Sequence, residues 1–328
     1  MIKLNRVCVT LTLDCNLHCK YCYRDRERMD IPDFTDDMKA YLSQLSPDWC
    51  EAVIASGGEP LLHWDKVKEL FSYVPHNVHK KIMSNCLLLT EDIVSYINDN
   101  EIELHFSHDG VQTSFLRGVD VLLIPQIRDL LKKVKYLRCF AVSTKFNVNV
   151  WENYLDTVKK LGRVDFSYKT FPMDDVSPLH ASLVDGFDYT TWLRTWTEFR
   201  LSSCFYELPW YKGQTLKETN SSHGFYTAYN VLPNGVICGM NRICSVYGTI
   251  HTPSYDDLQK KALSTGILDY CKSHYCPYVE SCEFPRETTT AHVCRCRRML
   301  MDFFHSDKPA QVRDYMSLHL LDVLKFYS

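Results

Sequence analysis

The sequence lacks the features that take a chain to a membrane or to nucleic acid. Residues 1–7 do not form the long uninterrupted apolar region of a signal peptide, and no later stretch of the 328 residues is apolar enough to span a bilayer. Lysine and arginine number 37 against 40 aspartate and glutamate residues, without a basic arm or stripe. We therefore expect a cytoplasmic protein without a membrane partner, and nothing in the charge pattern supports a nucleic-acid partner.

The sequence also lacks internal repeats, low-complexity tracts and flexible linkers. At roughly 100 to 200 residues per domain, its length suits one large α/β domain and a smaller module. Cysteine, by contrast, is abundant, with 15 residues. Because cytoplasmic thiols stay reduced, this abundance indicates metal or cluster ligation rather than disulfides. Five scattered cysteines are predicted to serve only in packing: Cys8, Cys50, Cys86, Cys139 and Cys204.

Three further cysteines, Cys15, Cys19 and Cys22, lie close together directly after an alternating apolar stretch. Three thiolates on one short loop can hold an iron-sulfur cluster and leave a fourth iron without a protein ligand, where a small molecule can bind. A zinc ribbon would need a second cysteine pair later in the chain, and a thioredoxin-like motif needs a single CxxC in a βαβ unit. The alternative is a chance group of buried or redox-idle cysteines.

The first half of the chain alternates between strand-like and helix-like segments. Predicted strands cover 4–13, 51–56, 79–84, 102–107, 136–144 and 164–169, and predicted helices begin near Thr35 and cover 64–73, 91–98, 119–134 and 150–161. Six strands separated by helices predict a parallel sheet with right-handed crossovers. On periodicity alone, a partial (β/α)6 barrel and a doubly wound open sheet fit equally well. In both, the reactive loops gather at the carboxyl ends of the strands.

Several strand ends carry chemistry-bearing residues. The second predicted strand ends in Gly57-Gly58-Glu59-Pro60, the third in Met83-Ser84-Asn85 and the fourth in Phe106-Ser107-His108-Asp109-Gly110. Glycines allow a backbone to come close to a ligand. Taken alone, each of these motifs is also typical of an ordinary turn.

Together, these motifs resemble those of a known family. Cys15-x3-Cys19-x2-Cys22, with an aromatic residue before the last cysteine, is similar to the signature of the radical S-adenosylmethionine (radical SAM) enzymes. The tetrapeptide at 57–60 resembles the GGEP motif of that family. Ser107-x-Asp109-Gly110 is similar to the end of the fourth strand in the subfamily of anaerobic sulfatase-maturing and peptide-modifying enzymes. The resemblance favours the α/β fold with a partial (β/α)6 TIM-type barrel.

The resemblance implies the cofactors and their contacts. Cys15, Cys19 and Cys22 are expected to bind a 4Fe-4S cluster, whose open iron chelates the amino and carboxyl groups of S-adenosylmethionine (SAM). The GGEP stretch is expected at the SAM amino group, and Tyr21 on the adenine. The expected SAM-contacting residues are Tyr21, Gly57, Gly58, Glu59, Pro60, Ser84, Asn85, Ser107, Asp109, Thr144 and Asn147. The pattern assigns no catalytic acid, base or hydrogen donor.

Seven cysteines crowd the last third of the chain: Cys238, Cys244, Cys271, Cys276, Cys282, Cys294 and Cys296. They resemble the SPASM or twitch extension of this subfamily, which holds auxiliary iron-sulfur clusters. The spacing from Cys271 to Cys276 is longer than usual, a further cysteine is missing after Cys244, and Cys294-x-Cys296 replaces the usual closing pattern. We expect one or two auxiliary clusters, with a zinc site as the main alternative.

The patterns divide the chain into four parts. These are a radical SAM partial barrel at 1–170, an aromatic-rich bridging region at 171–230, a SPASM/twitch-like cysteine-rich domain at 231–300 and a C-terminal helix at 301–328.

The resemblance implies an enzyme that cleaves SAM reductively to a 5′-deoxyadenosyl radical. The radical then modifies a peptide or protein by cross-linking or side-chain oxidation, with a ribosomally made precursor peptide as the leading substrate. An external electron donor of the flavodoxin or ferredoxin type is implied. A separate leader-peptide-binding protein is a further expected partner, because the chain begins directly at its first strand. The alternatives are a sulfatase-type maturase, a peptide epimerase, a small-molecule dehydrogenase, and a non-enzymatic metal-binding or redox-sensing protein.

Overall fold

The computed structural model describes nine stretches of the chain. They are residues 1–4, 6–22, 29–142, 144–147, 150–162, 165–169, 228–239, 242–254 and 257–258. Among the helices within these stretches, none has the length and apolarity that a membrane span needs. Most of the predicted aromatic bridge (all but residues 228–230), most of the cysteine-rich domain and the C-terminal helix lie outside the described residues.

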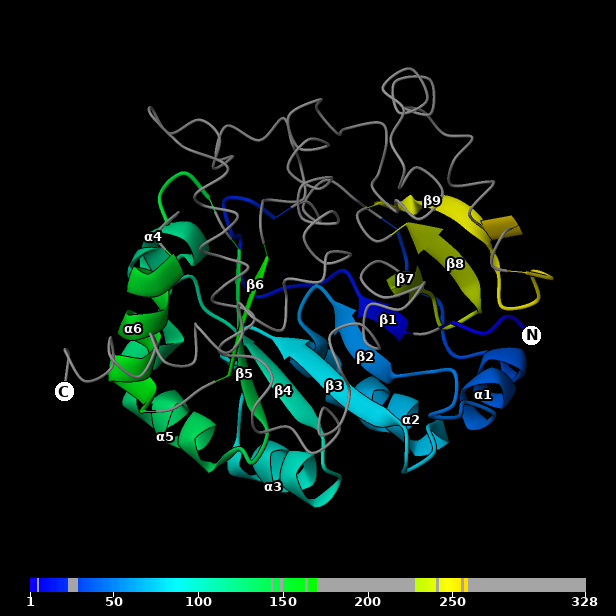
Figure 1. The fold of residues 1–328 in the computed structure, drawn as a ribbon, viewed down its shortest axis with the longest axis horizontal. Helices are drawn as coiled ribbons and strands as arrows, with labels where there is room; N and C mark the ends of the chain where they lie inside the picture. The colour runs from blue at the N-terminus through cyan, green and yellow to red at the C-terminus, as the bar shows by residue number, and fades with distance from the viewer. Residues whose placement is uncertain are drawn as a thin grey trace, which may run out of the picture.

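The centre of the fold is a parallel sheet of six strands in chain order (Figure 1). The strands are β1 (Arg6–Thr12), β2 (Ala52–Gly57), β3 (His79–Ser84), β4 (Glu103–Ser107), β5 (Leu137–Val142) and β6 (Asp165–Lys169). Each pairs in parallel with the next along the chain. All six strands predicted from the sequence are therefore present.

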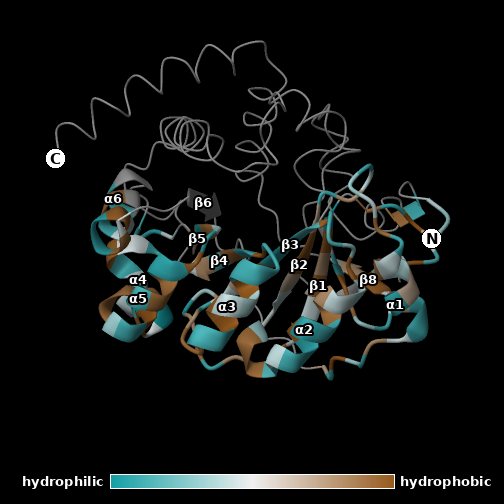
Figure 2. Ribbon diagram, turned by 90° about the horizontal axis from the view of Figure 1, so that it is seen from below, coloured by the Kyte–Doolittle hydropathy of each residue, from teal (hydrophilic) through white to brown (hydrophobic). Residues whose placement is uncertain are grey.

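Six helices follow one side of this sheet, as Figures 1 and 2 show. They are α1 (Asp36–Ser43), α2 (Trp64–Tyr73), α3 (Glu91–Asp99), α4 (Thr113–Arg117), α5 (Pro125–Lys133) and α6 (Val150–Leu161), with 3-10 turns η2 (Pro60–His63), η3 (Gly110–Gln112) and η4 (Val121–Leu123). A doubly wound sheet would carry helices on both faces. The arrangement confirms the α/β partial barrel.

Local sequence signals explain where two of these helices begin. Thr35 caps α1 by accepting a hydrogen bond from the Met38 backbone N–H at 3.3 Å, and Thr90 caps α3 in the same way with Ile93. A hydroxyl at the N-cap satisfies one of the backbone donors that the first turn leaves unpaired. The predicted start of a helix near Thr35 is confirmed.

One predicted helix is divided in the structure. The sequence predicted a continuous helix over 119–134, but η4 ends at Leu123 and α5 starts at Pro125. Ile124, between them, has an extended backbone with ψ 106°. The residue before a proline is disfavoured in the helical region because the proline ring crowds it, and a proline suits the first position of the following helix.

The sheet continues past β1 with three more strands. They are β7 (Ala228–Val231), β8 (Val236–Gly239) and β9 (Arg242–Thr249). β7 runs parallel to β1, and β8 and β9 follow in antiparallel pairing. The described part of the predicted cysteine-rich domain is thus joined to the barrel in a single nine-stranded sheet.

The two faces of the six parallel strands differ in character. On the helix-covered face, apart from Lys80 and Ser84 on β3, alternate residues are apolar and at most 1% exposed: Val7, Val9, Leu11, Val53, Ala55, Ile82, Leu104, Phe106, Cys139 and Ala141. The opposite face is mixed: its alternating positions carry Arg6, Thr10, Ser56, His79, Lys81, Glu103, His105 and Arg138, together with Cys8, Ile54, Met83, Phe140 and Val142. The main core lies between the sheet and its helices. Of the scattered cysteines, Cys8, Cys50, Cys86 and Cys139 are buried and not in disulfides, while Cys204 lies outside the described residues.

Candidate cluster and cofactor site

The three cysteines of the opening loop come together at the carboxyl end of β1. All three are half-buried and not in disulfides, and a turn closes where the Cys22 N–H donates to the Cys19 carbonyl at 2.9 Å. Burial raises the pKa of Cys19 to about 11; the neighbouring Cys22 and Cys15 thiols add to the rise, and the Arg117 guanidinium opposes it. The three thiols are therefore near enough to influence one another electrostatically. Three cysteines on one loop are the ligands that a 4Fe-4S cluster with one open iron requires.

The loop entry is held against the end of β2 by backbone contacts. The Gly58 N–H donates to the Thr12 carbonyl and the Glu59 N–H to the Asp14 carbonyl, each at 2.7 Å. A Cβ atom on Gly57 would lie 2.2 Å from the Thr12 carbonyl oxygen, and one on Gly58 would lie 2.0 Å from that of Asp14. Both glycines are therefore needed for the close approach of these two strand ends.

The Glu59 carboxylate joins the ends of β2 and β3. It is 1% exposed. One of its oxygens accepts from the Ser84 hydroxyl at 2.7 Å and from the Leu61 N–H at 3.0 Å, and the other accepts from the Asn85 N–H at 2.7 Å. Burial raises the pKa of Glu59, and these three donors counteract that rise by stabilising the ionised form. Within the protein, this carboxylate therefore bridges two strands.

Asn85 extends this bridge to the cysteine loop. Its Nδ2 donates to Asn16 Oδ1 at 2.7 Å and lies 3.9 Å from the Cys15 sulfur, while its Oδ1 accepts from the Leu87 N–H at 3.0 Å. Cys86, the next residue, has a positive φ of 64°. The end of β3 is therefore shaped so that one amide side chain contacts two residues of the cysteine loop.

The Asp109 carboxylate, at the end of β4, is fully buried and is the centre of a second network. Arg117 donates to it through Nε at 2.7 Å and Nη2 at 3.0 Å, the Val142 N–H donates at 2.9 Å, and the Tyr21 hydroxyl donates at 2.5 Å. Paired hydrogen bonds from a guanidinium to a carboxylate are among the stronger polar contacts in proteins. Asp109 thereby anchors the cysteine loop, through Tyr21, to β4 and β5.

Thr144 and Asn147, after β5, form a closed network with each other. Asn147 Oδ1 accepts from the Thr144 N–H at 2.6 Å and from its hydroxyl at 2.7 Å, and Asn147 Nδ2 donates to the Val142 carbonyl at 2.9 Å and the Asp109 carbonyl at 3.3 Å. Both residues are buried. Their polar atoms shape the turn that follows β5.

The remaining sequence-predicted positions also lie at this edge of the sheet. Pro60 is buried and begins η2. Ser107 is the last residue of β4 and is half-buried. Arg117 was not among the predicted site residues. No short spacing signals it, because its partner Asp109 lies eight residues earlier and the two meet only through η3 and α4.

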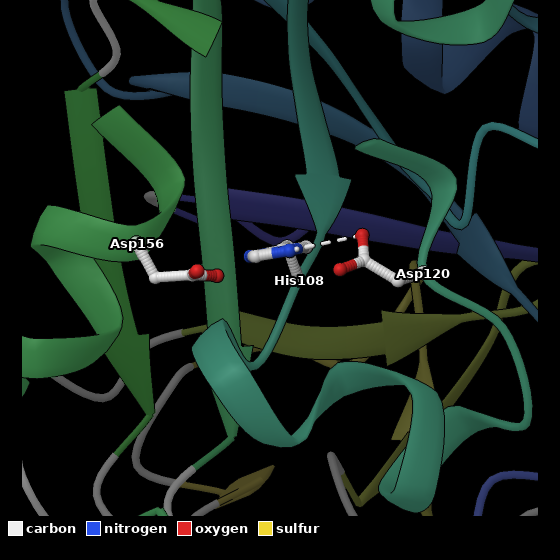
Figure 3. Close-up of side chains that lie close together, drawn as sticks. All are labelled: His108, Asp120 and Asp156. Carbon is white, nitrogen blue, oxygen red and sulfur yellow. Dashed lines mark hydrogen bonds and ion pairs between the residues drawn. The ribbon is translucent and has the colours of Figure 1, made fainter. Parts of the chain in front are cut away.

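Next to Asp109 the chain forms a buried charged cluster that resembles a metal site (Figure 3). His108 lies between Asp120 and Asp156, with its Nε2 3.2 Å from Asp120 Oδ1. The Gly110 N–H donates to His108 Nδ1, so Nε2 carries the ring proton and donates to Asp120. Lys160 Nζ lies 2.9 Å from Asp120 and 2.7 Å from Asp156.

The position of the cation in this cluster is therefore taken by the Lys160 ammonium. Burial by itself would raise the pKa of Asp120, but the His108 hydrogen bond and the Lys160 charge lower it to about 2. The cluster connects α6 to the end of β4 and to η4 by hydrogen bonds and ion pairs. Its role in the described structure is structural.

Two of the seven late cysteines fall on described backbone. Cys238 on β8 is fully buried beside Leu232, and Leu13, Ile31 and Val236 pack against this pair. Cys244 lies on the neighbouring strand β9. The other five, Cys271, Cys276, Cys282, Cys294 and Cys296, lie outside the described residues, so the ligation of auxiliary clusters stays a prediction.

Known proteins share this sequence pattern and this fold. The sequence model of the radical SAM superfamily matches residues 9–173, about half of the chain. The fold is similar to that of anSMEcpe with bound AdoMet (SAM), with a TM-score of 0.60 and 16% identity over 96% of this chain and 100% of that one. It is also similar to Streptococcus suis SuiB bound to the precursor peptide SuiA, with a TM-score of 0.57 and 17% identity over 89% of this chain and 76% of that one.

The chain also has a relative of similar sequence in Methanocaldococcus jannaschii. The uncharacterized protein MJ0907 of Methanocaldococcus jannaschii is 23% identical over 182 residues, which are 53% of this chain and 64% of that protein. Residues 9–173, which match the radical SAM model, include the cysteine loop and the ends of β2 to β5. The chain belongs to the radical SAM superfamily.

Proposed function

We propose that this radical SAM enzyme cleaves SAM reductively at a cluster held by Cys15, Cys19 and Cys22, and that it modifies a peptide or protein in the cytoplasm. The observation that carries the proposal is the convergence of the three thiols at the edge where β1 to β4 end. Superfamily membership implies a 4Fe-4S cluster and SAM. When bound, these cofactors supply one electron to the sulfonium and a 5′-deoxyadenosyl radical that removes a hydrogen atom from the substrate.

The contacts at this edge support separate roles for the predicted cofactor residues. The carboxylates of Glu59 and Asp109 are surrounded by protein donors, so we assign them to positioning the strand ends and the cysteine loop. Ser107 is half-buried and ends β4 on the face away from the helices. We assign its hydroxyl to a direct contact with SAM.

The charged groups on the face away from the helices are buried and pair with one another near the amino ends of their strands, so they stabilise the sheet and do not mark a substrate site. Glu103 Oε1 lies 2.6 Å from Arg138 Nε and Glu103 Oε2 lies 3.4 Å from Lys81 Nζ, with His105 on the same strand 3.1 Å from Glu103 Oε1. Peptide-bound structures share the fold, namely anSMEcpe with the Cp18Cys peptide and SuiB with SuiA.

We therefore propose cross-link formation or side-chain oxidation of a peptide, in the leading case a ribosomally made precursor. Seven late cysteines suit one or two auxiliary iron-sulfur clusters that would take up the electron left on the substrate. An external electron donor of the flavodoxin or ferredoxin type and a separate leader-peptide-binding protein are the proposed partners. Maturation of a sulfatase-type residue is the second candidate, since it uses the same radical chemistry on a protein side chain.

The central test is SAM cleavage by the anaerobically reconstituted full chain with dithionite. We expect 5′-deoxyadenosine from the wild-type protein and none from the C15A/C19A/C22A variant, which should also lose the iron of one cluster and keep any auxiliary iron. Cys50→Ala, which removes a buried thiol elsewhere in the core, is the matched control and should keep both cluster and product. Undiminished product from the triple variant would refute the proposal.

A further inference from the structure

An exposed pair of aromatic rings lies beside the cysteine loop. Phe115 on α4 is 46% exposed and Phe146, in the turn after β5, is 41% exposed. Their ring centroids are 4.9 Å apart and their planes meet at 74°, an edge-to-face contact. Single exposed apolar residues are common, but two exposed rings in contact, one from a helix and one from a turn, form a small apolar patch of the kind found at interaction sites.

Each ring of this pair has a lysine above it. Lys20 Nζ lies 4.9 Å from the centre of the Phe115 ring, and Lys145 Nζ lies 5.2 Å from that of Phe146. Neither ammonium forms an ion pair with a carboxylate in the described part of the chain. Other lysines there do form such pairs: Lys39, Lys66, Lys68, Lys133 and Lys135. The Lys–Phe patch, defined as Lys20, Phe115, Lys145 and Phe146, therefore carries two positive charges over two aromatic rings, and no carboxylate of the described residues pairs with either charge.

The Lys–Phe patch is built onto the cysteine loop itself. Lys20 directly follows Cys19, and its backbone N–H donates to the Leu116 carbonyl at 2.8 Å, one residue beyond Phe115. Consecutive Cα atoms are about 3.8 Å apart. A partner seated on the patch would thus rest within one residue of a predicted cluster ligand.

We propose that the Lys–Phe patch is the docking surface for a small acidic protein that carries one electron on a flavin or an iron-sulfur centre. The proposal rests on the function proposed above, because it assigns the cluster of the cysteine loop as the electron acceptor. One electron leaves the reduced carrier and enters the oxidised cluster, so that the carrier is oxidised and the cluster reduced by one electron each. No bond forms or breaks.

The chemistry of the patch fits this kind of partner. Weak redox encounters use small interfaces, with aromatic residues at the centre and charge complementarity that raises the association rate. Two lysines that form no ion pair among the described residues attract an acidic surface, and the two rings provide apolar contact once the proteins meet. Among the proposed partners, only an electron carrier has to come close to the cluster, because only the carrier transfers an electron to it.

The test measures reduction of the cluster without SAM, by stopped-flow bleaching of its visible absorbance, with a reduced flavodoxin or ferredoxin as the probe. We expect K20E/K145E to lower the second-order rate constant at low ionic strength by at least about tenfold and to flatten its salt dependence, because surface charge acts on encounter and is screened by salt. Lys145→Glu alone, outside the cysteine loop, should give part of the effect. Reduction by dithionite should be unchanged.

Lys132→Glu is the matched control, since Lys132 has a half-exposed side chain on α5 in the last turn of the helix. It should leave the carrier rate within about twofold of wild type. A wild-type carrier rate in K20E/K145E, an equal slowing with dithionite, or a change confined to the KM of a peptide substrate would each overturn the proposal. If wild-type protein accepts electrons from the carrier but yields no 5′-deoxyadenosine, the docking surface stands and the function proposed above fails.

Discussion

The two faces of the parallel sheet make different contacts, although the same strands form both. On β4, Leu104 and Phe106 point to the helices and are fully buried in the main core, whereas Glu103 and His105 alternate with them on the opposite face and contact other charged groups. Burial of apolar area provides most of the stability on the helix side. On the opposite face the charged groups pair with one another, and the candidate cofactor site lies at the carboxyl ends of the strands.

The carboxyl edge contributes both to stability and to the candidate cofactor site, because its buried carboxylates hold the strand ends in place. Glu59 and Asp109 are as buried as core residues, yet each accepts hydrogen bonds from several donors. A buried charge without partners would be costly, so such a network is favourable only while it is complete. The structure therefore couples the stability of this edge to the geometry of the cysteine loop.

The largest expected effect is from Asp109→Ala. It leaves the Arg117 guanidinium buried without a counter-charge, which costs about 3–5 kcal/mol in the free energy of unfolding, measured by denaturant titration. Glu91→Ala, which breaks the exposed ion pair to Lys133, should cost less than about 1 kcal/mol. In D109A/R117M the unpaired charge is gone, so part of the loss should be recovered. A loss for Asp109→Ala as small as that for Glu91→Ala would show that the edge network contributes little.

A second prediction compares the two faces within one strand. Leu104→Ala removes a fully buried side chain and should cost about 3 kcal/mol, because a cavity remains between β4 and its helices. His105→Ala, on the opposite face, should cost about 1 kcal/mol, since its side chain is partly exposed and is not part of the apolar core. Both values follow from denaturant unfolding at pH 7. Equal losses in the free energy of unfolding at the two positions would show that both faces of β4 contribute equally to stability.

The third prediction concerns pH and the polar face. Burial alone would raise the pKa of Glu103, but Lys81, His105 and Arg138 hold it well below its usual value of 4.5. Because the folded pKa lies below the unfolded one, the stabilisation is complete above about pH 4.5 and is lost as the pH falls through the folded pKa. Glu103→Gln should therefore be less stable than wild type by about 2 kcal/mol at pH 7, and the gap should narrow towards pH 3.

Thermal unfolding of both proteins from pH 7 to pH 3 measures this gap. Glu101→Gln, which alters an exposed glutamate paired with Lys135, is the control and should follow the wild-type profile. A gap that stays constant over this range would mean that Glu103 has the same pKa in the folded and unfolded states.

Much of the fold was predictable because local signals were strong. The alternation of strands and helices located all six parallel strands, and threonine caps marked the starts of α1 and α3. The error over 119–134 came from apolar periodicity that continued across Pro125, where the backbone before the proline ring cannot stay helical. Local chemistry outweighed the periodic pattern at that point.

The sequence predicted that the candidate site residues gather at one edge of the sheet, but it did not predict their contacts there, and their binding of a cluster or of SAM stays a prediction. The CxxxCxxC and GGEP motifs and the ends of β3 and β4 indicated the correct edge of the sheet, but Arg117 was missed, and the use of Glu59 and Asp109 as internal bridges was not foreseen. Sequence spacing shows which groups are near along the chain. It does not show how many donors surround a carboxylate once several strand ends meet.

For this protein, then, the sequence by itself determined the α/β class, the parallel strands and the loop that supplies three thiols, because periodicity and residue spacing are local properties of the chain. Only the tertiary structure decided that Tyr21, Asp109 and Arg117 form one network and that Lys20 and Lys145 stand over a pair of exposed rings. Apart from the contact of Lys145 with its neighbour Phe146, these contacts join residues that are 8 to 95 positions apart, and burial and charge pairing act only after the sheet has brought them together.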